Sequence, residues 1–467
     1  MSVSFAAHEA AQWCGTSVAE KYREILFSSV TIDSRNVEPG ALFVAIRGPR
    51  HDGHRFVESA LAAGARGLLL QSDSDSPRPS DTPILEVPDS TRALGDLARG
   101  HRSNFDGPLV AITGSSGKTT TKDMCAAALE AEAPCLKTQG NFNNEFGLPL
   151  TLLARKTEQA SAVIEMGMNH RGEIARLAEI ARPGVGLVTN VGTAHIEFLG
   201  SQEAIAEEKG DLFASLPANG IAVVNLEDPF VTEQAQRTAG ERLTYGFGRQ
   251  AAVRATDIAF ESEPESAFSF DLQALSRTEK IRVRGLGETT VINALAAAAG
   301  ALAAGSSPDQ VASGLAGYRP PAGRMNPILA SHGATVIDDT YNSNPESLDA
   351  ALEALARHAS PGRSFAILGD MNELGDRAHD EHRAAGRKVV ELGIDFLFVI
   401  GQHGGLMIDA AVEAGLERNN TLASTDHDEV SAAIRAHSRV GDWILVKGSR
   451  GIHMEHVVNS ILSKENR

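Results

Sequence analysis

The feature that most constrains the fold of this chain is residues 109–124, where an apolar run, a turn of small residues and a helical segment follow one another. The small residues let backbone N–H groups converge on phosphate oxygens, and the positive end of the helix favours the same anions. Lys118 is placed to reach the terminal phosphates of a nucleotide, and Thr119 to offer a hydroxyl to Mg²⁺. The candidate phosphate-binding residues are Gly114, Ser115, Ser116, Gly117, Lys118, Thr119 and Thr120.

The spacing of this loop departs from the full Walker A pattern. That pattern has a glycine five positions before Gly117, where this chain has Ile112. An ordinary strand-to-helix turn with a solvated lysine is the alternative, and the order of strand, turn and helix favours phosphate binding over it. The shortened loop alone is compatible with a kinase, a nucleotide switch or a ligase.

Composition indicates a large globular protein. A chain of 467 residues suggests about three domains at roughly 150 residues each. The net charge of −17 argues against a general nucleic-acid or anionic-membrane surface. The three cysteines lack metal-type or redox-pair spacing, and no signal peptide or membrane-spanning run is found, so we expect a cytoplasmic protein with reduced thiols.

The order of apolar runs predicts an α/β protein of three domains. Residues 1–106 are expected to form a small α/β domain. Residues 107–318 are expected to form a doubly wound, mostly parallel sheet carrying the phosphate loop, with antiparallel strands over 250–284. Residues 319–467 are expected to form a Rossmann-like domain after the proline-containing segment 317–323. Strands are expected at 41–46, 67–71, 84–87, 109–113, 161–165, 185–190, 221–225, 335–338, 364–368, 396–400 and 443–446.

Polar residues at predicted strand ends are candidates for chemistry, since ligands of parallel sheets bind there. Glu165 ends one strand and is placed to share the Mg²⁺ that Thr119 reaches, and His195 follows another and could hold a second ion. Taken alone, a helix-capping glutamate or a packed histidine would explain each. Segments 138–149 and 338–345 are rich in amides and carboxylates, which suits a polar ligand, although an Asn/Gly turn would explain the first.

These segments, in this order, resemble the Mur ligase family of ATP-dependent amide-forming enzymes, and the resemblance covers nearly the whole chain. The matching motifs are Asp33–Arg35, Gly40–Gly48, Asp52–His54, Thr113–Thr120, Gly140–Asn144, Glu165–Asn169, Thr189–His195, Gly323–Met325, Asp338–Pro345, Leu368–Gly375 and Lys447–Arg450. Within the family, the first- and third-domain motifs resemble those of the ligases that add D-alanyl-D-alanine to UDP-N-acetylmuramoyl-tripeptide.

The resemblance implies a mechanism. ATP would phosphorylate the terminal carboxylate of the UDP-linked tripeptide, and the amine of D-Ala-D-Ala would attack the acyl phosphate. The implied catalytic residues are Lys118, Glu165, His195, Lys209 and Arg324. Two Mg²⁺ ions would be held by Thr119, Glu165, His195 and Lys209, with Lys209 matching a family lysine that becomes carbamylated. From the residues alone, an exposed helix lysine paired with Glu207 or Asp211 is the simpler interpretation of Lys209, and only the resemblance favours the carbamate over it.

The resemblance also implies ligand contacts. Asn293, Arg324, Asp339 and Asn342 would join the phosphate loop in binding nucleotide, whereas Ser34, Arg35, Asn141, Asn143, Asn144 and Lys447 would bind the other substrates. Relatives commonly carry a histidine where this chain has Thr289, so contacts near the adenine are expected to differ. No nucleic-acid partner or membrane insertion is expected, and the protein is expected to be a monomer that closes its domains on its ligands.

Two other classes compete with the ligase. A P-loop kinase or switch would leave the clusters at 141–144 and 338–345 unexplained, and a non-catalytic nucleotide-binding module would not need Glu165, His195 and Lys209 together. Among related ligases, the Asp-Asn-Pro sequence of the enzyme that adds the third residue is absent here. Folate polyglutamate ligases share the phosphate loop but lack the Asp33–Arg35 motif.

Overall fold

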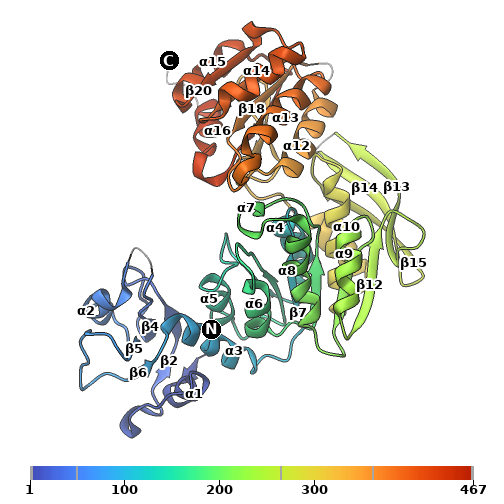
Figure 1. The fold of residues 1–467 in the computed structure, drawn as a ribbon. Coiled ribbons are helices and arrows are strands. Elements are labelled where there is room, and N and C mark those ends of the chain that lie inside the picture. The colour runs from blue at the N-terminus through green and yellow to red at the C-terminus, as the bar shows by residue number, and fades with distance from the viewer. Residues whose placement is uncertain (1–3, 49–50, 263–265, 360–361, 464–467) are drawn as a thin grey trace.

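The computed structural model describes residues 4–48, 51–262, 266–359 and 362–463, which form three α/β domains in a bent row (Figure 1). The N-terminal domain is built on a four-stranded parallel sheet of order β3-β4-β5-β6. Its strands are β1 (Phe5–Ala6), β2 (Leu26–Phe27), β3 (Ser29–Thr31), β4 (Ala41–Val44), β5 (Gly67–Gln71) and β6 (Ile84–Val87), and its helices are α1 (Ala7–Trp13), α2 (Val57–Ala62) and α3 (Ser90–Arg102).

The central domain has a nine-stranded sheet of order β15-β14-β13-β12-β11-β10-β7-β9-β8. Every neighbouring pair from β8 to β13 in this order is parallel, whereas the β13–β14 and β14–β15 pairs are antiparallel. The strands are β7 (Leu109–Thr113), β8 (Cys135–Lys137), β9 (Ser161–Glu165), β10 (Val185–Val188), β11 (Ile221–Asn225), β12 (Glu241–Gly246), β13 (Val253–Glu261), β14 (Ala267–Ala274) and β15 (Arg277–Arg284). The helices are α4 (Lys118–Glu130), α5 (Gly147–Leu153), α6 (Glu173–Ala181), α7 (Ile196–Leu199), α8 (Gln202–Ala214), α9 (Pro229–Gln234), α10 (Thr289–Ala303) and α11 (Pro308–Gly317).

The third domain has a six-stranded sheet of order β16-β17-β21-β18-β19-β20, parallel except for β16. Its strands are β16 (Asn326–Leu329), β17 (Thr335–Asp339), β18 (Ser364–Gly369), β19 (Phe396–Ile400), β20 (Thr421–Ser424) and β21 (Trp443–Lys447). Its helices are α12 (Pro345–His358), α13 (Ala378–Glu391), α14 (Gly404–Ala414), α15 (His427–His437) and α16 (Glu455–Leu462). The predicted α/β class, the antiparallel strands and the Rossmann-like third sheet are confirmed, whereas the domain limits at 106 and 318 stay predictions.

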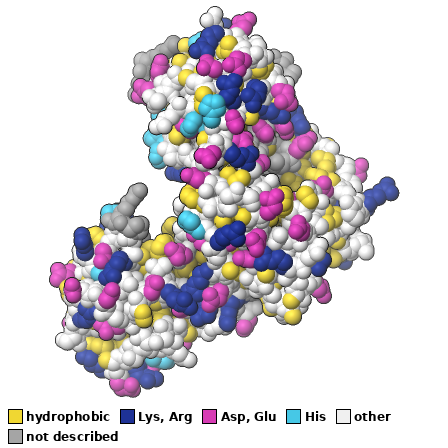
Figure 2. Space-filling model, in the orientation of Figure 1, with side chains coloured by type: hydrophobic (Ala, Val, Ile, Leu, Met, Phe, Trp, Pro, Cys, Tyr) yellow, Lys and Arg dark blue, Asp and Glu magenta, His cyan; other side chains and the backbone are white. Residues whose placement is uncertain are grey.

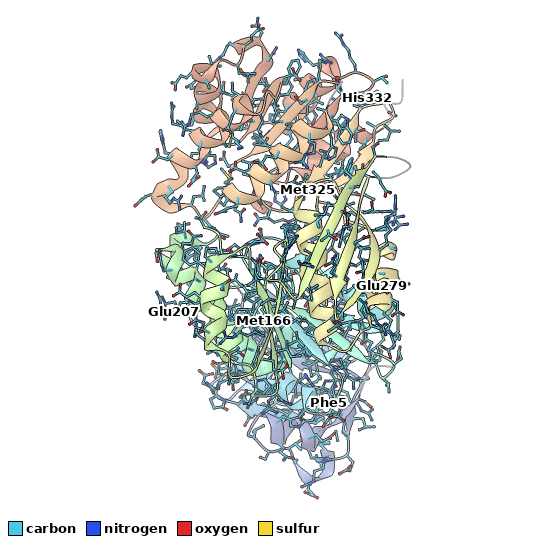
Figure 3. The ribbon with its side chains drawn as sticks, turned by 90° about the vertical axis from the view of Figure 1, so that its right-hand side faces the viewer. Phe5, Met166, Glu207, Glu279, Met325 and His332 are labelled. Carbon is cyan, nitrogen blue, oxygen red and sulfur yellow. The ribbon has the colours of Figure 1, made fainter. Side chains whose placement is uncertain are left out.

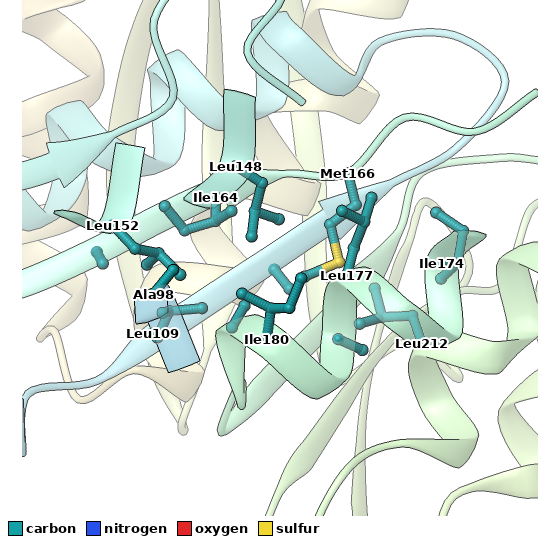
Figure 4. Close-up of a cluster of buried hydrophobic side chains, with 14 of the residues drawn as sticks. Ala98, Leu109, Leu148, Leu152, Ile164, Met166, Ile174, Leu177, Ile180 and Leu212 are labelled. Carbon is teal, nitrogen blue, oxygen red and sulfur yellow. The ribbon is translucent and has the colours of Figure 1, made fainter. Parts of the chain in front are cut away.

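Helix α3 joins the N-terminal domain to the central one. It begins where Asp89 accepts hydrogen bonds from the N–H groups of Thr91 and Arg92, at 2.8 and 3.0 Å. Its apolar face packs on α5 and α6, so a single hydrophobic cluster runs from the N-terminal sheet to one face of the central sheet. Figure 4 shows part of this cluster, with Ala98 of α3 beside Leu109 and Leu152 of the central domain.

This shared core predicts a large stability effect at Leu97, which is fully buried in α3. Leu97→Ala is expected to lower the free energy of unfolding by about 2 to 5 kcal/mol, because it leaves a cavity in the shared hydrophobic cluster. Urea unfolding measures the change. Val440→Ala is the control: Val440 is 80% exposed, so its loss should change the free energy by about 0.5 kcal/mol or less.

No helix among the described residues is both long enough and apolar enough to cross a membrane. On the face shown in Figure 2, basic and acidic side chains are interspersed, and the molecule is hollowed between the third and N-terminal domains.

Candidate active site

The phosphate loop leaves β7 and enters α4 through two glycines with positive φ, 149° at Gly114 and 75° at Gly117. A Cβ atom at Gly114 would lie 1.9 Å from the Thr189 hydroxyl, and one at Gly117 would lie 2.5 Å from the side-chain Oδ1 atom of Asn293. Both positions therefore require glycine for conformation and for space. The same approach places Asn293 of α10 directly beside the loop.

Two residues after β10 hold the loop from the neighbouring strand. The Thr189 hydroxyl donates a 2.6 Å hydrogen bond to the Ser116 carbonyl, and the Ser116 N–H donates to Asn190 Oδ1 at 3.0 Å. The predicted strand 185–190 ends at Val188 instead, and Thr189 and Asn190 leave the strand to bond the phosphate loop. Asn190 was not among the predicted site residues, although it lies inside the Thr189–His195 motif.

Lys118, the first residue of α4, is half-buried, and its Nζ donates a 2.6 Å hydrogen bond to the Gly114 carbonyl. Burial lowers the pKa of this ammonium, the charge of Glu165 partly offsets that effect, and Arg324 adds to the lowering. The Lys118 side chain thus folds back over the phosphate loop.

Thr119 joins the central and third domains. Its hydroxyl donates to Glu165 Oε2 at 2.9 Å, and Nη2 of Arg324, which precedes β16, donates to the same hydroxyl at 2.9 Å. Glu165 is only 3% exposed at the end of β9, and its other oxygen accepts a 2.8 Å hydrogen bond from Asn143 Nδ2. The predicted residues Thr119, Asn143, Glu165 and Arg324 therefore form one cluster.

His195 lies at the start of α7 with a left-handed backbone, at φ 67°. Its Nδ1 atom is 2.6 Å from Glu373 Oε2 of the third domain. The close contact with His195 lowers the pKa of Glu373. His195 is therefore contacted by Glu373 of the third domain, a partner that the sequence did not indicate.

Lys209 is buried in α8 with 1% exposure, so the alternative of an exposed lysine paired with Glu207 or Asp211 is wrong. Those two acids bind arginines instead: Glu207 lies 3.2 Å from Arg171, and Asp211 pairs with Arg237. Figure 3 shows Glu207 at the outer edge of the molecule. Burial first, and then the charge of Lys118, places the pKa of Lys209 well below its ordinary value.

The adjacent ends of β17 and β21 carry an ion pair, Asp339 on β17 and Lys447 on β21. Lys447 is 2% exposed, and its Nζ donates to Asp339 Oδ2 at 2.6 Å and to the Asn342 carbonyl at 2.9 Å. The other Asp339 oxygen accepts from the Met325 N–H at 3.1 Å, so Asp339 supports the linker next to Arg324. Met325 lies where the central and third domains meet (Figure 3).

A cavity of about 840 Å³ brings most of the predicted residues together. Its lining includes Ser115, Ser116, Gly117, Lys118, Thr119, Thr120, Asn141, Asn143, Asn144, Glu165, His195, Asn293, Arg324, Asp339, Asn342 and Lys447. Thr289, at the unusual position, also lines it. Gly114, Lys209, Ser34 and Arg35 are outside its lining.

Several predicted substrate-binding residues have structural partners. Arg35 forms two hydrogen bonds to Asp33, at 2.9 and 2.7 Å, next to Ser34 on the N-terminal domain. Asn144 Oδ1 accepts from two N–H groups at the start of α5, so the turn interpretation accounts for that side chain. His54 is buried between Asp52 and the Gln71 N–H. Residues 49 and 50 of the neighbouring loop lie outside the described residues.

Further cavity residues were not predicted. Tyr341 lies under Arg324, whose guanidinium carbon is 3.9 Å from the ring centroid, which orients the arginine by a cation–π contact. Arg171 and Glu346 also line the cavity, as does Arg450. The aromatic ring in segment 338–345 was the signal for Tyr341, whereas Arg171 and Glu346 have no such signal because arginine and glutamate are common on ordinary protein surfaces.

Comparison with known proteins agrees with this geometry. Residues 26–102 match the Mur ligase family catalytic domain, 112–301 the Mur ligase middle domain, and 323–450 the Mur ligase glutamate ligase domain. The UDP-N-acetylmuramoyl-tripeptide–D-alanyl-D-alanine ligase of Escherichia coli is 36% identical over 441 residues, covering 94% of each chain, and that of Bacillus subtilis is 33% identical over 448 residues, covering 96% of each.

Solved structures give the same result. A crystal structure of MurF from Acinetobacter baumannii matches with a TM-score of 0.88 and 31% identity, covering 99% of this chain and 100% of that one. MurF ligase from Thermotoga maritima in complex with ADP matches with a TM-score of 0.82 and 30% identity, covering 93% of this chain and 96% of that one. With family matches in all three domains and relatives of this similarity over nearly the full length, the chain belongs to the Mur ligase family.

Proposed function

We propose that this protein is an ATP-dependent amide-bond ligase that joins D-alanyl-D-alanine to the terminal carboxylate of UDP-N-acetylmuramoyl-tripeptide. The observation that carries the proposal is the convergence of Lys118, Thr119, Glu165 and His195 of the central domain with Arg324 of the third domain on one cavity. Relatives that bear this activity in their names match over nearly the whole chain. The reaction belongs to bacterial cell-wall synthesis in the cytoplasm, and a monomer suffices for it.

The reaction has two steps. The γ-phosphoryl group passes from ATP to a carboxylate oxygen of the tripeptide, forming the acyl phosphate and ADP. The free amine of D-Ala-D-Ala then attacks the acyl carbon, and inorganic phosphate leaves as the amide forms. Lys118 and Arg324 neutralise charge that develops on the transferred phosphoryl oxygens, and their pre-set positions avoid reorganisation at that moment.

The donor set suits Mg²⁺. Thr119 and Glu165 place a hydroxyl and a carboxylate oxygen 2.9 Å apart, and hard oxygen donors are what Mg²⁺ prefers. We assign one ion to Thr119 and Glu165 and a second to His195 and a carbamylated Lys209. Bound Mg²⁺ supplies charge neutralisation for the phosphate and carboxylate oxygens.

The remaining contacts divide between nucleotide and substrates. We assign Gly114 to Thr120 to the phosphates, Asn293 to the adenine, and Asp339 and Asn342 to the ribose side. We assign Ser34 and Arg35 to the uridine diphosphate, and Asn141, Asn143 and Asn144 to the muramoyl side. Lys447 approaches the phosphates when the third domain closes. The domains 1–106, 107–318 and 319–467 then serve UDP-substrate binding, ATP binding, and acceptor binding with closure.

Acceptor dependence tests the proposal. Phosphate release from ATP is expected only when UDP-muramoyl-tripeptide and D-Ala-D-Ala are both present, because the acyl phosphate is protected from water until the amine arrives. Diaminopimelate or L-lysine as acceptor on a defined UDP-linked peptide should give no product by mass spectrometry. Steady ADP formation without an acceptor would support a kinase or switch instead.

A further inference from the structure

Two carboxylates of the third domain hold one short segment of the central domain, Gly192–His195. Glu346 Oε1 accepts hydrogen bonds from the Thr193 N–H at 2.7 Å and from the Thr193 hydroxyl at 2.8 Å. Glu373 Oε2 lies 2.6 Å from His195 Nδ1. The two contacts fall two residues apart on a segment that lines the cavity through His195.

The segment is shaped for the first of these contacts. A Cβ atom at residue 192 would lie 2.9 Å from the carboxyl carbon of Glu346, so Gly192 allows this approach. Glu346 is in the first turn of α12, which Asn344 caps by accepting the Ser347 N–H at 2.9 Å. The carboxylate therefore extends from a fixed helix end.

Glu373 is also presented on a fixed loop. It has a left-handed backbone, φ 63°, which costs energy for a residue other than glycine and persists only where the surroundings impose it. The buried Asp370 carboxylate accepts the N–H groups of Gln402 and His403 at 2.8 and 3.1 Å, and fixes the start of the loop.

His382 completes this support. Its Nε2 accepts the Met371 N–H at 3.0 Å, and its Nδ1 donates to the Ala378 carbonyl at 2.5 Å. Although Asp370, His382 and His403 are close enough to hold a metal ion, both ring nitrogens of His382 are already engaged. We therefore read the cluster as the base of the Glu373 loop.

We propose that Glu346 and Glu373 are positioning residues, which clamp Gly192–His195 when the third domain docks and hold His195 with Nδ1 against the Glu373 carboxylate and Nε2 left for the cavity. A carboxylate on one ring nitrogen selects the tautomer whose other nitrogen has a free lone pair. Domain docking thereby sets the orientation of a ligand-binding histidine. For the role of His195 in catalysis, this inference rests on the proposed function.

The test uses Glu373→Asn in the full chain, because asparagine tolerates a left-handed backbone better than most residues. Glu413→Gln is the control, since the Glu413 side chain is 63% exposed and pairs with Arg383 of the same domain. In ¹⁵N-histidine spectra, His195 is assigned from the signal missing in His195→Asn. Glu373→Asn is expected to shift this signal away from the Nδ1–H tautomer and to lower kcat about 10- to 100-fold with KM for ATP unchanged. Glu413→Gln should change none of these.

Gly192 provides a second, independent measurement. Gly192→Ala keeps both carboxylates but obstructs the Glu346 contact, so its effect on kcat should not add to that of Glu346→Ala in the double variant. An unchanged His195 signal in Glu373→Asn, a shifted signal with an unchanged kcat, or full additivity of the two substitutions would each overturn the inference. Acceptor dependence tests the proposed function independently of this inference, because the slowed variants should still release phosphate only with D-Ala-D-Ala present.

Discussion

Replacing Lys118 with methionine is expected to lower kcat by about 10²- to 10³-fold, the scale seen when one pre-set transition-state donor is removed. Lys118 Nζ already lies 2.6 Å from the Gly114 carbonyl, over the loop that would hold the phosphates. Methionine keeps much of the chain length and the packing but supplies no charge. Phosphoryl transfer depends on neutralising oxygen charge, so the chemical step should lose more than ATP binding.

Initial rates of phosphate release at saturating ATP measure this effect. Lys388→Met is a suitable control, because Lys388 is on helix α13 of the third domain and is paired with Glu353 and Glu391. The control should retain full activity, and both variants should unfold at the wild-type temperature. A Lys118→Met enzyme with normal kcat would contradict the assignment of the loop to phosphate.

Local patterns predicted the sheets well. The expected strands 67–71, 84–87, 109–113, 161–165 and 221–225 have the same bounds in the structure. Buried parallel strands are continuous apolar runs bounded by turn residues, so nearby residues determine where each strand begins and ends. Short strands such as β8, with three residues, lack enough sequence to form a recognisable pattern.

The candidate site was predicted less completely, because part of it depends on contacts between domains. Thr119, Glu165 and Arg324 were expected together, and the Thr119 hydroxyl is hydrogen-bonded to both of the other side chains. The partners of His195 could not be found in this way: Glu373 lies far along the chain and meets His195 only after the third domain has folded and docked. Such a contact leaves no periodicity or spacing in the sequence.

Lys209 shows a different limit. Its neighbours Glu207 and Asp211 give the local sequence the appearance of a solvated helix face. The structure pairs both acids with arginines from other elements and leaves Lys209 on the buried side of α8. Burial of a lysine is thus decided by what packs on the helix, and the family resemblance was the only indication of a special role.

If Lys209 carries the proposed carbamate, Lys209→Ala is expected to lower kcat by on the order of 10³-fold, because the negative charge proposed to bind Mg²⁺ would be lost. An ammonium about 4 Å from a divalent ion would cost about 8 kcal/mol at an effective dielectric of about 20. Burial and the charge of Lys118 lower the pKa of Lys209, so the neutral amine is the dominant form at lower pH than for an ordinary lysine. The neutral amine is the form that adds to CO₂, giving a carbamate and releasing one proton.

This chemistry distinguishes Lys209 from a structural lysine. With ¹³C-bicarbonate, the wild-type protein should show a carbamate carbon signal that is lost in Lys209→Ala and in Lys209→Arg, since a guanidinium remains protonated. Removal of CO₂ from the buffer should lower wild-type activity, and bicarbonate should restore it. Lys122→Arg is the control, because Lys122 is also buried but donates to the Thr138 carbonyl at 2.8 Å; it should keep the carbamate signal. A wild-type enzyme with full activity and no carbamate signal would show that Lys209 acts as an unmodified amine.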